Sequence, residues 1–200
     1  MPAWASPALW RPEHSPATVI VARAPEDFTA ARSIDPDRQE PVIQHADTEN
    51  GRHVLLDDPE GRHRIWLVES VHTRAGSAFL VPFDDDFGAR LHSLQRLHRR
   101  LIGKRAGPPL RSLQLSPTQR ARLTLLVRAF DGEQEGVSRR EIAAVLLDAE
   151  ARHIPAIEWK NAALRKRVNR VVASSVALMS GGYLALLRGD PTRAQRFRRL

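Results

Sequence analysis

A cluster of cationic and amide side chains near the C-terminal end of the chain is the best candidate for chemistry. Its members are Arg165, Lys166, Asn169 and Arg170. Arginine donates paired hydrogen bonds to a phosphate or a guanine edge, and asparagine pairs in a similar way with adenine. At about 100° per residue, the four side chains share one arc of a helix, opposite Leu164 and Val168. The spacing predicts a helix with a nucleic-acid-binding face.

Four more cations lie beside that arc or in the segment before it. Arg167 and Lys160 flank the arc, and Arg139 and Arg140 open a neighbouring short helix. The residues expected to contact DNA are therefore Arg139, Arg140, Lys160, Arg165, Lys166, Arg167, Asn169 and Arg170. A plain solvated helix face is the alternative interpretation of the same run. The scarcity of acids favours DNA, since only Glu158 and Asp190 are acidic between residues 151 and 200.

The charge of the chain is distributed unevenly. Its formal net charge is +8, but residues 1–85 hold 8 Lys/Arg against 14 Asp/Glu, whereas residues 86–200 hold 23 against 9. A basic surface gains affinity for nucleic acid by releasing counterions, so the second half is expected to bind a polyanion. Of the 31 cations 28 are arginine, a bias that the codon usage of a GC-rich genome also explains.

The histidines and acids form no catalytic or metal-binding pattern. Eight histidines are present, but none stands in a His-Glu-x-x-His arrangement, and the chain has no cysteine to bind zinc or act as a nucleophile. The acids of 84–86 precede a predicted helix, where they stabilise the positive end of its dipole. No glycine-rich phosphate loop ending in Lys-Ser/Thr occurs. We therefore expect a protein that is not an enzyme and that uses no metal or cofactor.

Helical periodicity begins near Asp86 and continues through the second half. From Asp86 onward, apolar residues recur at three- and four-residue steps (Phe87, Leu91, Leu94, Leu97 and Leu101), and a helix of about 15 residues follows the N-cap pair Ser116-Pro117. A capping box of Ser138 and Glu141 opens a short helix over 139–147. Residues 156–179 are predicted to form one long helix that ends at Gly181-Gly182. Residues 183–187 form either a short helix or a wing strand.

This order of helices matches the helix-turn-helix plan, in which the third element enters the major groove. The expected core consists of Leu126, Phe130, Ile142, Leu146, Leu164 and Val168. The apolar face of the long helix is expected to carry Ile157, Leu164, Val168, Val171, Val172, Ser175 and Met179. Trp159 is expected to pack on a neighbouring helix. The gap over 148–155 is longer than the three or four residues of a tight helix-turn-helix, so the spacing does not define how the helices cross.

The first half predicts strands. Short β-branched or apolar runs occupy 18–22, 53–57, 64–69 and 78–82, and Asp58-Pro59-Glu60-Gly61 is a turn sequence that makes a hairpin of the middle two. The expected fold class is α+β, with a small antiparallel sheet followed by a helical DNA-binding-like domain. The expected division is an acidic, proline-rich region over 1–85, a helix-turn-helix-like domain over 86–190 and a basic tail over 191–200.

The length of 200 residues allows one ordinary domain or two small ones. No apolar run approaches the roughly 18 to 20 residues of a membrane span, and the N-terminus lacks the apolar core of a signal peptide. We therefore expect a cytoplasmic protein with no membrane partner.

Several runs of the second half resemble a proteobacterial family of domains of unknown function. They are 126–132, 136–143, Trp159, 164–168 and 178–187, and the Leu9-Trp10-Arg11-Pro12 opening resembles longer members. Members occur in regulators of integrative and conjugative elements, as activators of excision or as antiactivators that bind other regulators. The resemblance, over about residues 90–190, implies a helix-turn-helix regulator.

Two functions follow as expectations. The first is a transcriptional regulator of a mobile or conjugative element that binds double-stranded DNA. The alternative is an antiactivator that masks a regulatory protein without touching DNA, through the acidic first half or the apolar segment 183–187. Salt separates them, because DNA binding weakens steeply with ionic strength.

Overall fold

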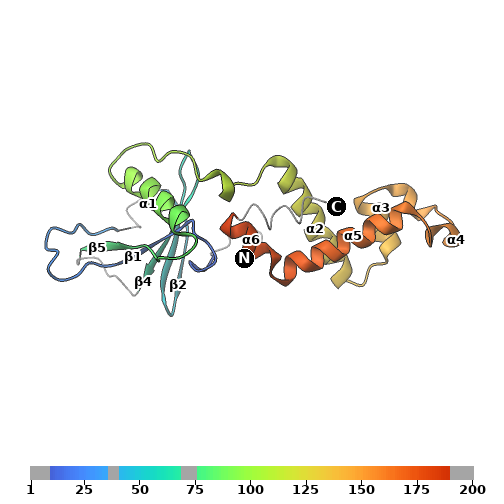
Figure 1. Ribbon diagram of the computed structural model, residues 1–200, viewed down its shortest axis with the longest axis horizontal. Helices are drawn as coiled ribbons and strands as arrows, with labels where there is room; N and C mark the ends of the chain where they lie inside the picture. Colours follow the sequence, from blue (N-terminus) through green and yellow to red (C-terminus); the bar gives the residue numbers. More distant parts are fainter. Residues whose placement is uncertain (1–9, 36–40, 69–75, 190–200) are drawn as a thin grey trace. The chain divides into compact units, whose positions relative to one another are not determined.

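The computed structural model describes residues 10–35, 41–68 and 76–189. The chain folds as two compact units, residues 1–114 and 115–200. The first unit contains a β-sheet and one long helix, and the second is helical (Figure 1). The expected α+β class is confirmed. The expected tail over 191–200 and Leu9 of the N-terminal opening lie outside the described residues.

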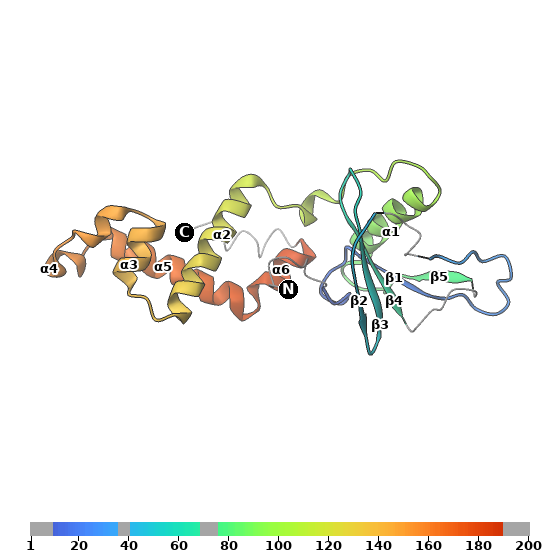
Figure 2. The ribbon, with the colours of Figure 1, turned by 180° about the vertical axis from the view of Figure 1, so that it is seen from behind.

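Within the described residues, five strands form the sheet of the first unit. They are β1 (Thr18–Arg23), β2 (Val42–Thr48), β3 (Gly51–Leu56), β4 (His63–Val68) and β5 (Ser77–Leu80), in the spatial order β2-β3-β4-β1-β5. Strand β1 pairs in parallel with β4, and the remaining neighbours are antiparallel (Figure 2). The sheet is therefore mixed, and the prediction of an antiparallel sheet was wrong in this respect. The sequence of a strand shows how its side chains alternate between the two faces of a sheet, but it does not show which strand pairs with it or in which direction.

Strand β2 was absent from the sequence prediction. Its sequence, VIQHADT, lies at the edge of the sheet, with side chains that alternate between half-buried and exposed. Few apolar residues are needed at such an edge, so its periodicity is weak. The predicted hairpin between β3 and β4 is confirmed. Gly61 closes its turn with φ of 117°, and the Gly61 amide donates to the Asp58 carbonyl at 2.9 Å.

Helix α1 (Phe87–Leu101) covers one face of this sheet (Figure 1). Its buried Leu97 packs against the strand residues of the sheet core, which are Val19, Val21, Val54, Leu56, Ile65 and Leu67. The structure therefore places α1 with the sheet, and the division falls after residue 114. The sequence analysis placed the boundary between domains near residue 86, because strands give way to helices there. A compact unit is instead defined by which apolar faces bury one another.

The second unit consists of α2 (Pro117–Gln134), α3 (Arg139–Leu146), α4 (Ala156–Trp159), α5 (Ala163–Ala177) and α6 (Tyr183–Arg188). Helices α2, α3 and α5 pack on one another in pairs. Leu126, Ile142 and Val168 are buried in their core, with Leu146 and Leu164 packed against it as expected. Phe130 is half-buried and is not part of this cluster.

The single long helix predicted over 156–179 is wrong. Its first four residues form the separate helix α4, and α5 begins only at Ala163. Ile157 was assigned to the buried face but is 79% exposed, and Met179 is also exposed. Ile157 and Leu164 have the spacing of one face of a single helix, but they lie in two separate helices, α4 and α5. Between α3 and α4 lies a turn of 3₁₀ helix, Ala149–Arg152.

The caps agree only in part with the sequence. Ser116 and Gln119 form a complete reciprocal capping box at the start of α2. Ser138 accepts from the Glu141 amide at 3.2 Å, as expected, but the Glu141 carboxylate, predicted to return to the cap, binds Arg152 instead. The residues at a helix start show which side chains can form a capping box. They do not show whether an arginine from elsewhere in the fold binds the glutamate more strongly.

Gly181 separates α5 from α6. Its φ of 113° is unfavourable for any other L-residue, and the backbone bends there before Tyr183–Arg188 resumes as a short helix rather than a wing strand. Taken as one run, 163–188 is long enough for a membrane span, and an 18-residue stretch within it has a mean hydropathy of 1.5. The prediction that no run approaches this limit was too strong, because two amphipathic helices joined at a bend pass the same test. Val168, Val171 and Val172 are buried in the helical core.

Candidate nucleic-acid interface

The outer side of α5 brings most of the predicted binding residues together. The helix buries Val168, Val171, Val172 and Ser175 on one side. Four side chains with hydrogen-bonding groups lie exposed on the remainder of its surface: Lys166, Arg167, Asn169 and Arg170. Of the predicted outward arc, Lys166, Asn169 and Arg170 are exposed as expected, and Arg165 is not.

Arg165 and Lys160 differ from these four. Arg165 is half-buried, and its Nη1 donates to the Lys160 carbonyl at 3.2 Å. Lys160 itself is exposed and follows α4 directly. The Arg165 guanidinium thus contributes to the junction that connects the two helices. The sequence could not predict this contact, because it expected one uninterrupted helix.

Arg139 and Arg140 lie at the start of α3 and are both engaged within the unit. Arg139 Nη2 donates to Glu133 Oε1 at 2.9 Å, and this hydrogen bond lowers the pKa of the Glu133 carboxyl. The Arg140 guanidinium lies over the ring of Trp159, 5.4 Å from its centroid. Trp159 is half-buried against the core, as predicted. Both arginines therefore order the unit, and their partners orient the guanidinium groups.

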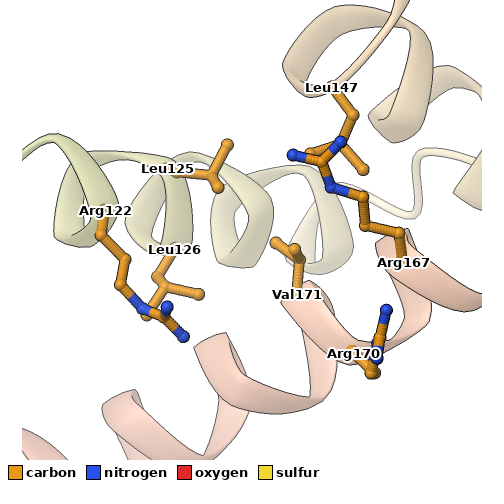
Figure 3. Close-up of a pocket in the computed structure, with 7 residues that line it drawn as sticks. All are labelled: Arg122, Leu125, Leu126, Leu147, Arg167, Arg170 and Val171. Carbon is orange, nitrogen blue, oxygen red and sulfur yellow. The ribbon is translucent and has the colours of Figure 1, made fainter. Parts of the chain in front are cut away.

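The structure adds a cation that sequence reasoning missed. Arg122 of α2 lines a pocket of about 300 Å³ together with Arg167 and Arg170 of α5 (Figure 3). The rest of its lining is apolar: Leu125, Leu126, Leu147 and Val171. No property of the α2 sequence distinguishes Arg122 from Arg120 or Arg128, so only the packing of α2 on α5 could identify it.

The electrostatic balance of this unit favours anions. Residues 115–189 contain twelve Lys/Arg against seven Asp/Glu, and no acid occurs between residues 159 and 189. Two of the seven acids, Glu133 and Glu141, are paired with Arg139 and Arg152. Arginine hydrogen bonds also lower the pKa of Glu141. The cations of α5 therefore have no acidic neighbour along their own helix.

The arginines of α1, in the other unit, have a different role. Arg90 Nη1 donates to the Pro12 carbonyl at 3.0 Å and Arg90 Nη2 to Asp84 at 2.8 Å. Arg96 donates from Nε to the Gly107 carbonyl at 2.7 Å and from Nη2 to the Gly61 carbonyl at 2.8 Å. Both side chains are buried. Much of the positive charge of 86–114 therefore binds loops to the helix.

A buried polar group accompanies these arginines. His63 Nε2 lies 3.4 Å from the Asp58 carboxylate, which also binds Arg100 at 3.0 Å. Burial, reinforced by the Arg96 charge, lowers the pKa of His63. Burial alone would raise the pKa of Asp58, but hydrogen bonds from the Glu60 amide and Arg100 hold it below its usual value. Within the described residues, no group of three His, Asp or Glu side chains could hold a metal ion.

Comparison with known families agrees with a nucleic-acid interface in the second half. Residues 80–188, more than half of the chain, match the family described as "T6SS, Transcription factor, DNA binding domain" (RovC_DNA-bd). Residues 17–75 match a domain of unknown function, DUF7012, and include β1 to β4. No curated protein and no solved structure matches the chain. The chain belongs to the family of T6SS transcription factor DNA-binding domains.

Proposed function

We propose that the chain is a transcriptional regulator that binds double-stranded DNA through the outer side of α5. The observation that supports this assignment is the position of Lys166, Arg167, Asn169 and Arg170, exposed along a helix whose opposite side is buried in the core. Arginine and asparagine can both bind base edges, and lysine can bind phosphate. The match to a DNA-binding family supports the same conclusion.

The dimensions of α5 suit the major groove. Its 15 residues span about 22 Å at 1.5 Å per residue, and a helix fits a groove about 12 Å wide. Ala163, Ala173 and Ala177 are also exposed, and their small side chains let the helix approach the bases closely. Sixteen residues separate α3 from α5, so the helix-turn-helix in this proposal is an open one, with α4 between its second and third helices.

The regulated genes and the site of action are part of the proposal. The sequence resemblance favours a mobile or conjugative element, whereas the description of the matched family names T6SS. A DNA-binding regulator acts in the cytoplasm of a bacterial cell. Promoters of both kinds therefore belong in the binding test, in addition to the region upstream of the chain's own gene.

The proposal is tested with the triple variant Lys166→Ala, Asn169→Ala and Arg170→Ala. Arg165 is left in place because it joins α5 to α4. The control replaces Arg120 and Arg128 with alanine, which removes two exposed cations from α2. Fluorescence anisotropy on each duplex at two salt concentrations gives the affinity and the salt slope.

The triple variant should bind at least about tenfold more weakly, since one bidentate pairing with a base contributes about 1 to 3 kcal/mol. Its salt slope should fall by about one for each phosphate that the variant no longer binds. The control should lose much less affinity. Unchanged affinity and slope in a folded triple variant would remove α5 as the DNA-binding helix. A wild-type chain that binds no duplex but forms a salt-resistant complex with a regulator would instead support the antiactivator.

A further inference from the structure

The pocket between α2, the end of α3 and α5 has an unusual lining. Three arginines, Arg122, Arg167 and Arg170, line it, and none of the described residues in its lining is acidic. Figure 3 shows Arg122 extending from α2 toward α5, while Arg167 extends from α5 toward Leu147. The three guanidinium groups lie apart around the lining, and no carboxylate lies among the described lining residues. Positive charge of this kind with no carboxylate nearby favours an anion as its partner.

Hydrogen bonding supports the same conclusion. Within the described part of the chain, none of the three arginines forms an ion pair, in contrast to Arg139 and Arg152 of the same unit. The Nε of Arg122 is buried and has no hydrogen-bond partner there. The described part of the protein therefore leaves the Arg122 guanidinium without a hydrogen-bond acceptor, which an anionic ligand would supply.

The floor of the pocket is apolar. Leu126 is 2% exposed and Val171 is buried beside it, and Leu125 and Leu147 complete the wall. Leucine and valine side chains bind hydrocarbon rather than a hydrated ion. The volume of about 300 Å³ is near the lower limit for small-molecule pockets, so the ligand is small.

We propose that this pocket binds a small anionic amphiphile, a carboxylate or phosphate monoester on a short hydrocarbon chain. Its anionic group accepts hydrogen bonds from the Arg122 guanidinium, the charges of Arg167 and Arg170 attract it, and its chain lies on Leu126 and Val171. A DNA phosphate is the other anion that the arginines could bind. The sugar-phosphate backbone, however, offers no hydrocarbon to cover the leucine and valine floor.

Occupation of the pocket has a consequence for DNA binding, and this step rests on the proposed function. Arg167 and Arg170 belong both to the pocket and to the exposed cations of α5. A ligand anion neutralises two of the groups that bind phosphate or bases. The amphiphile therefore acts as an effector that weakens DNA binding.

The test measures ligand binding to the full chain without DNA. Isothermal titration calorimetry uses octanoate and octyl phosphate, each below the concentration at which it forms micelles, with octanol and inorganic phosphate as the separated halves. Wild type should bind one or both amphiphiles at least about tenfold more tightly than either half. The two amphiphiles distinguish a carboxylate from a phosphate head group.

Arg122→Gln is the diagnostic variant, and Arg120→Gln, an exposed arginine of the same helix, is its control. Loss of a charge-assisted hydrogen bond should weaken binding about tenfold or more in Arg122→Gln and leave Arg120→Gln unchanged. Arg122→Lys retains the charge and should recover part of the affinity. Circular dichroism melts establish that each variant is folded.

Three results would overturn the inference: no heat of binding with either amphiphile, inorganic phosphate binding as tightly as octyl phosphate, or equal losses in Arg122→Gln and Arg120→Gln. Anisotropy with DNA then tests the effector step, in which the bound amphiphile should weaken DNA binding of wild type but not of Arg122→Gln. If wild type binds the amphiphile but no duplex, the proposed function fails and the pocket assignment stands.

Discussion

Two valines of α5 provide a test of the register of this helix. Val168 is fully buried and Val176 is 40% exposed, and both lie within the same helix. Replacing each with alanine makes the same chemical change in the same type of secondary structure. The difference in helix propensity is therefore common to both variants and cancels in the comparison.

The magnitude follows from burial. Removing two buried methyl groups at Val168 costs about 1.6 kcal/mol, at about 0.8 kcal/mol each. A residual cavity of roughly 50 Å³ adds about 1 kcal/mol, at about 24 cal/mol per Å³. Val168→Ala should therefore lower the free energy of unfolding by about 2 to 3 kcal/mol. Val176→Ala should change it by less than about 1 kcal/mol, because part of the side chain is already in water and alanine favours the helix.

Urea denaturation followed by far-ultraviolet circular dichroism measures both variants against wild type. The helical signal arises mainly from α2, α3 and α5 of the second unit together with α1 of the first. Equal destabilisation by the two substitutions, or a loss below about 1 kcal/mol for Val168→Ala, would show that α5 does not bury the predicted face. The assignment of its outer side to DNA would then lose its structural basis.

Three further predictions concern the backbone, a cap and a buried histidine. Gly181→Ala should lower the free energy of unfolding by about 1 kcal/mol or more, because φ at this position is 113°. Gly88→Ala, in open space within α1, should be neutral or stabilising. Thermal melts in which Gly88→Ala is the less stable variant would contradict the bend at Gly181. Ser116→Ala should cost about 1 kcal/mol by removing the capping box of α2, and an unchanged midpoint in urea would contradict this cap. The pKa of His63 is lowered in the folded state, so on acidification the histidine of the unfolded chain is protonated first. The stability that neutral His63 contributes is therefore fully present above about pH 6.5. It is lost as the pH falls from there through the pKa of the folded state. His63→Gln should make stability less dependent on pH between about 7.5 and 5, and an unchanged slope would mean that His63 does not titrate as described.

Local features of this protein were predictable from its sequence. Ser116 with Pro117 marked the start of α2, Gly61 marked the turn between β3 and β4, and the apolar period through Leu164 and Val168 placed the exposed side of α5 correctly. These features depend on residues a few positions apart, whose spacing matches the 3.6-residue or two-residue period of the backbone. The absence of acids from residues 159–189 is likewise evident from the sequence alone.

Features that depend on distant residues required the tertiary structure. The parallel pairing of β1 with β4 joins segments more than forty residues apart, and α1 packs on the sheet through Leu97. The interruption after Trp159 divides a run whose periodicity indicated one helix. In each case the local pattern was compatible with several arrangements, and long-range burial selected one of them.

The arginines show this division most clearly. Composition established that the second half is basic, but each arginine has the same local chemistry. Packing buries Arg96 against loop carbonyls, stacks Arg140 on Trp159 and places Arg122 in the lining of the same pocket as Arg170. A guanidinium is available to a ligand only where the fold leaves its donors unpaired. The sequence by itself determined how much positive charge this protein has, and only the tertiary structure decided where that charge can bind an anion.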